Sequence, residues 1–202
     1  MFEQLVNSIM NSHNSHNNNN GSNTVNIKGY RYDADKVLVL NKLAETAKTL
    51  LEGAITQREP RIPSTKKRLP ELTAFIRDTV LESNTSIPTL LVCLLYVEKF
   101  TNKFTKRVNG AHDSCYRVFL ACLILASKYV NDVTYKNDFW GSLWPQFNLE
   151  DVNSMERELL VLLNFKLVFS PEEVNSFIRQ YFGATNSTTL LTPQSWYASV
   201  SV

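Results

Sequence analysis

Glycine and cysteine are scarce in this 202-residue sequence, which holds six glycines and three cysteines. No segment matches GxGxxG or GxxxxGK[ST], the glycine-rich loops that cradle phosphates, and HExxH is absent as well. The cysteines are odd in number and too few for a disulfide framework, and two of them lie in a strongly apolar run. These absences exclude the common nucleotide-binding loops and a disulfide scaffold, and they suit a reducing compartment.

A strong charge excess and a long apolar segment are also missing. The 21 basic and 19 acidic residues leave a formal net charge of +2, whereas proteins that neutralise nucleic-acid phosphates are usually strongly basic. The longest apolar stretch, residues 118–126, is far shorter than the roughly 20 residues that span a bilayer, and no signal-peptide pattern opens the chain. We therefore expect a soluble, intracellular protein without a membrane segment, and nucleic acid is not its leading partner.

Residues suited to catalysis are few. The nearest candidate for a nucleophile with its base is Cys115 beside His112 and Asp113, but groups adjacent in sequence need not converge in space. His13 and His16 have no cysteine or carboxylate nearby that could complete a metal site. We expect no catalytic residue, no cofactor and no metal, so the chain is predicted not to be an enzyme.

Composition divides the chain into four parts. The opening is rich in Asn, Ser and His and offers little apolar surface to offset the entropy of ordering. An amphipathic helix follows from Asp35 to Leu51, where apolar residues recur at spacings of three and four, and a basic, proline-containing linker comes after it. The expected division is a disordered segment at 1–30, the helix and linker at 31–69, a main body at 70–183 and a tail at 184–202.

The main body shows the pattern of five helices. They are expected to begin after Pro70, near Pro88, at Asp113 or Ser114, after Asn148 and after Ser170. The third is apolar nearly all round and must therefore be central, and an aromatic connection separates it from the fourth. No hairpin dipeptide lies between alternating runs, so the predicted class is all-α.

Three segments resemble one known family. They are YVEKF at 96–100, LACLILASKY at 120–129 and NSMERELLVLLNFK at 153–166. The sequence thereby resembles the cyclin box over about residues 70–182. The resemblance implies a single five-helix cyclin box with an extra N-terminal helix, and a non-catalytic subunit that binds and activates a cyclin-dependent protein kinase.

The resemblance also implies a kinase-binding site. Lys128 and Glu156 match the lysine and glutamate that hydrogen-bond the kinase near its mobile regulatory helix. Tyr129, Leu160 and Phe165 match apolar positions that pack against that helix. The alternative is that Lys128 and Glu156 form an ordinary exposed pair.

A finer resemblance is to the fungal Pcl-type cyclins, which partner the yeast phosphate-pathway cyclin-dependent kinase and so imply control of cell-cycle or nutrient-responsive phosphorylation. The supporting residues are Tyr116 to Phe119 (YRVF), Asn131, Asp132, Tyr135, Asn137 and Trp140. The segment ELTAFIRDTV at 71–80 departs from the substrate-docking sequence of mitotic cyclins. We expect one box only, as in the Pcl type.

Two other functions remain open at this stage. A cyclin-fold transcription or adaptor factor would bind nucleic acid or a scaffold without activating a kinase, and the basic residues Lys99, Lys103, Lys106 and Arg107 would suit it. A helical-bundle enzyme would depend on Cys115.

Overall fold

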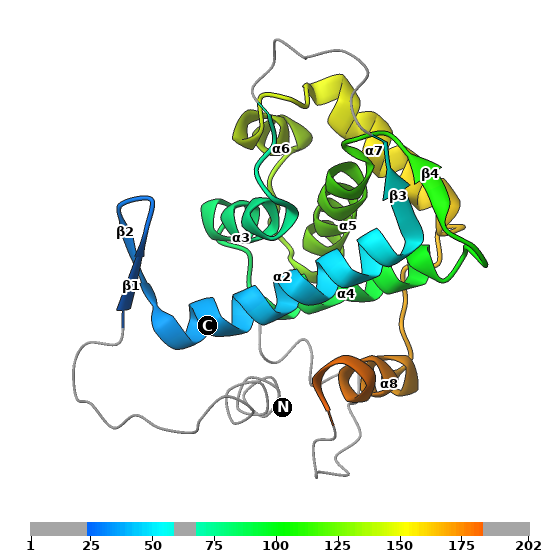
Figure 1. The fold of residues 1–202 in the computed structure, drawn as a ribbon, viewed down its shortest axis with the longest axis horizontal. Coiled ribbons are helices and arrows are strands. Elements are labelled where there is room, and N and C mark those ends of the chain that lie inside the picture. The colour runs from blue at the N-terminus through cyan, green and yellow to red at the C-terminus, as the bar shows by residue number, and fades with distance from the viewer. Residues whose placement is uncertain (1–23, 59–67, 184–202) are drawn as a thin grey trace. The chain divides into compact units, whose positions relative to one another are not determined.

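The computed structural model describes residues 24–58 and 68–183 of the chain (Figure 1). Three segments lie outside the described residues: residues 1–23, where disorder is expected, residues 59–67 of the linker, and the tail from residue 184. The described residues separate into two compact units, of which the larger lies within residues 43–168 and the smaller combines residues 24–42 with 169–183.

Helices make up most of the described structure, as the all-α prediction requires. Every helix expected from the sequence is present. One further short helix, α6, replaces the aromatic connection that the sequence suggested. The helices are α2 (Ala34–Ala54), α3 (Leu72–Glu82), α4 (Ile87–Thr101), α5 (Ser114–Val130), α6 (Asn137–Leu143), α7 (Leu149–Leu162) and α8 (Pro171–Phe182).

Helix α5 is the centre of the larger unit. Each residue from Phe119 to Ser127 is buried, so this part of the helix has no solvent-exposed face. Helices α3, α4 and α7 all pack against it (Figure 1). The central position follows from the sequence, because a helix that is apolar all round needs neighbours on every side.

The helix boundaries follow local capping signals. The Ser86 hydroxyl accepts the backbone N–H of Thr89 at the start of α4. Asn148 and Asp151 form a capping box at the start of α7, and Ser170 forms one with Glu173 at the start of α8. These side chains satisfy backbone amides that the first helical turn leaves unpaired, as the sequence predicted for α7 and α8.

A short hairpin corrects the expected disorder of residues 24–30. Strands β1 (Thr24–Ile27) and β2 (Tyr30–Asp33) pair antiparallel across a two-residue turn. Lys28 and Gly29 both have positive φ, at 51° and 86°, which is the geometry that two-residue hairpin turns favour. The Asn26 side chain also accepts the Gly29 N–H, so local hydrogen bonds order this segment.

A second pair of strands was not predicted either. Strands β3 (Ile55–Gln57) and β4 (Val108–Gly110) pair in parallel within the larger unit, although about fifty residues separate them. At Gly110 an added Cβ would lie 2.6 Å from the Ser114 hydroxyl oxygen and 2.8 Å from Ile55 Cγ2. A glycine is therefore required where β4 passes the start of α5.

Helix α2 extends the helix predicted at 35–51 by a few residues. Within the larger unit its buried apolar side chains are Leu43, Ala44, Ala47 and Leu51, which recur at the helical period. Lys48 lies outside this stripe and forms an ion pair of 2.7 Å with Glu71, the residue that caps α3. None of the described helices is long and apolar enough to cross a membrane.

Candidate functional site

Cys115, His112 and Asp113 do not have the properties of a nucleophile with its catalytic base. Burial, together with the negative charge of Glu52, raises the pKa of the Cys115 thiol to about 11, so little thiolate exists at neutral pH. His112 is exposed, and Asp113 accepts a hydrogen bond of 2.7 Å from Arg117. The thiol of Cys115 therefore lies in the core, and Asp113 is engaged elsewhere.

Metal ligands do not gather in the part of the chain that the structure describes. No group of three His, Cys, Asp or Glu side chains there has the proximity that a metal ion needs. The histidines His13 and His16 lie outside that part.

Near the N-terminal end of α5, Arg117 forms an ion pair with α7. The guanidinium contacts Asp113 at 2.7 Å and Asp151 of α7 at 3.3 Å, and it lies 5.3 Å from the ring centroid of Phe147. Burial acts to lower the pKa of Arg117, but the two carboxylates outweigh it and raise that pKa. Asp151 thus takes part in the capping box of α7 and also joins the two helices.

The predicted polar pair, Lys128 and Glu156, lies near the opposite end of α5. Lys128 is in the last turn of α5 and Glu156 is in α7, 28 residues away, yet the packing of these helices brings the side chains together. Lys128 Nζ donates to Glu156 Oε1 at 2.6 Å and to Oε2 at 2.8 Å. The side chains are 37% and 15% exposed respectively, so the lysine is the more accessible partner.

Asn137, the first residue of α6, completes a polar network around this pair. Its Nδ2 atom donates to Glu156 Oε2 at 2.7 Å and to Asn153 Oδ1 at 2.8 Å. The sequence identified Asn137 only as part of the finer family resemblance. Its contact with Glu156 could not be found without knowing that α6 exists and packs on α7.

Apolar side chains border the polar pair. Tyr129 is 40% exposed, and its ring meets the edge of the buried Tyr96 ring with 6.4 Å between centroids. Leu160 is half-buried and lies one turn after Glu156 on the same helix. Phe165 is 68% exposed, which is unusual for so large an apolar side chain. We call Lys128, Tyr129, Glu156, Leu160 and Phe165 the α5–α7 surface.

The backbone that carries Phe165 is strained but well held. Asn164 and Phe165 have φ of 53° and 58°, in the left-handed region that aromatic residues seldom occupy. The Phe165 N–H donates to Leu160 O at 2.9 Å, while Lys99 donates to the carbonyls of Lys166 and Val168. Left-handed conformations of this kind are concentrated at functional sites, so Phe165 marks a candidate contact.

Comparison with known proteins agrees with this architecture. The model of the cyclin N-terminal domain matches residues 39–168 of the chain. The chain belongs to the cyclin family. That match begins within α2 and ends before α8, and the boundaries at residues 70 and 183 expected from the sequence stay a prediction. Cyclins are non-catalytic regulators of protein kinases, in agreement with the prediction that this chain is not an enzyme.

Several yeast and plant cyclins are similar to the chain. PHO85 cyclin-9 of Saccharomyces cerevisiae is 33% identical over 152 residues, which is 71% of this chain and 50% of that protein. PHO85 cyclin-1 of the same yeast is 34% identical over 139 residues, or 67% of this chain and 50% of its own length. Cyclin-U2-1 of Arabidopsis thaliana is 30% identical over 77 residues, covering 38% of this chain and 34% of that cyclin. The chain spans about half the length of the two yeast relatives, and the resemblance to the Pcl group is thereby confirmed.

Proposed function

We propose that the chain binds a cyclin-dependent protein kinase through the α5–α7 surface and activates it as a non-catalytic regulatory subunit. The observation that carries the proposal is the paired Lys128 and Glu156, bordered by the exposed rings of Tyr129 and Phe165. Large apolar side chains around a hydrogen-bonded charged pair are typical of the energetic centre of an interface. Family membership supplies the kind of partner.

The geometry suits recognition of a kinase backbone or polar side chain. Lys128 has three N–H donors and contacts one carboxylate, so an N–H is left to donate to a carbonyl of the kinase. The carboxylate oxygens of Glu156 have further lone pairs that can accept kinase N–H groups. Because the two side chains already hold each other in place, less side-chain entropy is lost on binding.

Activation requires that the surface prefer one position of the kinase regulatory helix. A protein kinase is active when the lysine of its third strand pairs with the glutamate of that helix. Moving such an equilibrium from 1:99 to 99:1 takes a preference of roughly 5.5 kcal/mol. Exposed side chains that a partner buries on binding, as proposed for Tyr129 and Phe165, commonly contribute about 2 kcal/mol or more each, so two such anchors and the charged pair would suffice.

The related yeast proteins suggest the type of kinase. Their names associate them with PHO85, and we extend that association to this chain as part of the proposal. The complex would then control cell-cycle or nutrient-responsive phosphorylation in the nucleus or cytoplasm. No substrate follows from the described residues.

Purified complexes test the proposal. Lys128→Ala, Glu156→Ala and Phe165→Ala should each reduce affinity for a PHO85-type kinase by about thirtyfold, the equivalent of about 2 kcal/mol, and reduce activation at limiting concentration. Lys106→Ala and Glu158→Ala remove similar exposed charges outside the α5–α7 surface and should leave both quantities unchanged. Wild-type activation by all three surface variants would refute this assignment.

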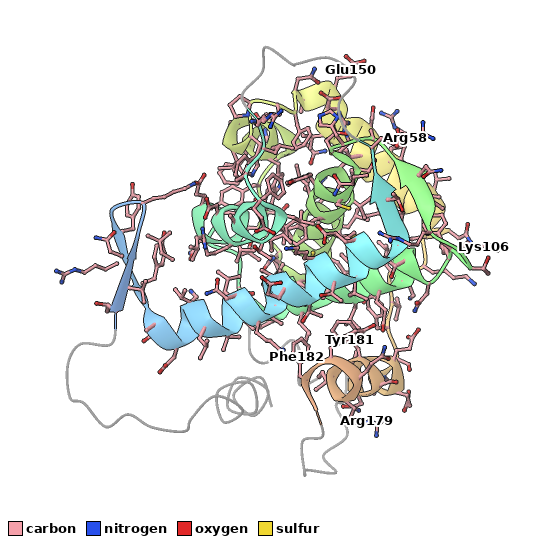
Figure 2. The ribbon with its side chains drawn as sticks, in the orientation of Figure 1. Arg58, Lys106, Glu150, Arg179, Tyr181 and Phe182 are labelled. Carbon is pink, nitrogen blue, oxygen red and sulfur yellow. The ribbon has the colours of Figure 1, made fainter. Side chains whose placement is uncertain are left out.

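The exposed basic residues between α4 and β4 favour one other candidate, an adaptor that binds nucleic acid. Lys103 and Lys106 are exposed and form no ion pair among the described residues. In Figure 2, Lys106 and Arg58 are both labelled at the β3–β4 end of the larger unit. Lys99 is instead engaged with backbone carbonyls, which weakens the cluster expected from the sequence. A titration with duplex DNA at several salt concentrations separates the two functions, because several released counterions would give a steep salt dependence.

A further inference from the structure

The carboxylate of Glu156 is held from two sides. Lys128 bridges both of its oxygens from α5, whereas Asn137 donates only to Oε2 from α6. A lysine ammonium on a flexible stem acts as a point charge and constrains the carboxylate plane weakly. The amide is planar and directional, so the Asn137 contact distinguishes one carboxylate oxygen from the other.

The orientation of the Asn137 amide is determined by its neighbours. An ionised carboxylate only accepts hydrogen bonds, so the NH₂ group must face Glu156. The same Nδ2 atom also reaches Asn153 Oδ1 at 2.8 Å. The Oδ1 atom of Asn137 is buried and has no hydrogen-bond partner among the described residues. A buried acceptor left unpaired costs stability, which indicates that the amide is retained for its two donor contacts.

Aromatic packing fixes the position of Asn137. Trp140 of α6 is 1% exposed, and the rings of Tyr135 and Phe139 stack with centroids 3.8 Å apart. Tyr135 also meets Trp140 edge to face at 6.1 Å. The short helix is thereby anchored on both sides of Asn137, and the amide is presented from a rigid element rather than from a loose connection.

The network is open to a partner on one side. A shallow hollow of about 450 Å³ lies beside it, and Lys128, Asn137 and Asn153 are among its lining residues. A kinase segment can therefore approach the network beside Lys128, whose side chain is more exposed than that of Glu156.

We infer that Asn137 is a positioning residue for kinase binding: it orients the Glu156 carboxylate so that the carboxylate and Lys128 meet the kinase in one fixed geometry. The inference rests on the proposed function. It adds to the α5–α7 surface a residue from α6 that acts through Glu156 and need not touch the kinase.

A double-mutant cycle tests this role. Asn137→Ala should weaken binding of a PHO85-type kinase about tenfold in the wild-type chain and have almost no further effect in a Glu156→Ala chain. Asn137→Leu keeps similar volume without the donors and should behave like Asn137→Ala. Asn153→Ala removes the other acceptor of Nδ2 but leaves Glu156 paired, so it should change affinity less than twofold. Thermal melts of each variant report whether folding is retained.

The outcomes separate the inference from the proposed function. If Glu156→Ala weakens binding and neither Asn137 variant does, the inference is wrong and the proposed function stands. An equal loss from Asn137→Ala in both backgrounds would also overturn it, because the effect would then not pass through Glu156. If neither Glu156→Ala nor Lys128→Ala changes the affinity, the proposed binding surface itself is refuted.

Discussion

Exchanging the two charges of the Lys128–Glu156 pair distinguishes an internal ion pair from a partner-binding one. The double variant Lys128→Glu with Glu156→Lys keeps opposite charges at the contacts of 2.6 and 2.8 Å. A half-turn of the Asn137 amide would let its Oδ1 accept from the introduced lysine at the cost of the contact with Asn153, so we expect the exchange to be tolerated inside the protein with at most a small loss of stability. Towards a partner, however, the donor and the acceptor have changed places.

The expected magnitudes differ between folding and binding. Partly exposed ion pairs contribute about 0–1 kcal/mol to stability, so each single reversal should lower the free energy of unfolding by about that amount and the exchange should restore most of it. Reversing a desolvated charge at an interface costs about 2–5 kcal/mol, or roughly thirtyfold to several thousandfold in Kd. The exchange should therefore leave kinase binding as weak as either single reversal does.

Two measurements on the same samples decide the matter. Urea denaturation gives the free energy of unfolding, and isothermal titration calorimetry against the kinase gives Kd. If the exchanged variant recovers affinity together with stability, the pair acts only within the chain. The assignment of Lys128 and Glu156 to the binding surface would then be incorrect.

Three further predictions concern stability and chemistry. Burial acts to raise the pKa of Glu71, but hydrogen bonds from Lys48, Thr73 and the Ala74 N–H lower it to about 2. Ionised Glu71 should therefore stabilise the folded protein above pH 4.5, by less than about 1 kcal/mol because the side chain is exposed, and this stabilisation should be lost as the pH falls towards 2. Glu71→Gln should flatten that part of the stability profile. Thr79→Val keeps the side-chain shape but removes the hydroxyl, which accepts from Trp144 Nε1 at 2.9 Å and donates to Phe75 O at 2.6 Å, and should cost about 1–3 kcal/mol in urea denaturation. Unchanged stability would show that the two bonds together contribute nothing. All three cysteines are buried, so a thiol reagent at pH 8 should label them only after denaturant is added, and rapid labelling of the native protein would contradict their place in the core.

The long helices could be predicted because each carries its own signals. Residues 118–126 are apolar all round, and Asn148 and Ser170 begin their helices with recognisable caps. The seven-residue helix α6 could not, because it contains Gly141 and its aromatic residues have no helical period over so short a span. The parallel pairing of β3 with β4 depends on residues far apart in the chain, which no local pattern encodes.

The candidate site was predictable in part. Family resemblance identified Lys128 and Glu156 together, although they lie in two unconnected segments, and the packing of α5 on α7 brings them into contact. Asn137 was identified only as part of the finer resemblance and not as a site residue, since its contact with Glu156 depends on the packing of α6 on α7. Similarly, the left-handed backbone at Phe165 cannot be foreseen from an aromatic residue, which ordinarily avoids that conformation.

The burial of α5 limits how a protein of this design can be redirected to another partner. Between Phe119 and Ser127 every side chain of the helix is buried, so nearly every substitution there disturbs the packing of the core before it changes recognition of a partner. Ion pairs to α7 are formed by Arg117 at one end of α5 and by Lys128 near the other, which leaves the helix little freedom to rotate. Variation that alters recognition at tolerable cost in stability is therefore expected outside residues 119–127, for example in the connections at residues 131–136 and 164–168, and a library aimed at another partner should leave the buried part of α5 unchanged.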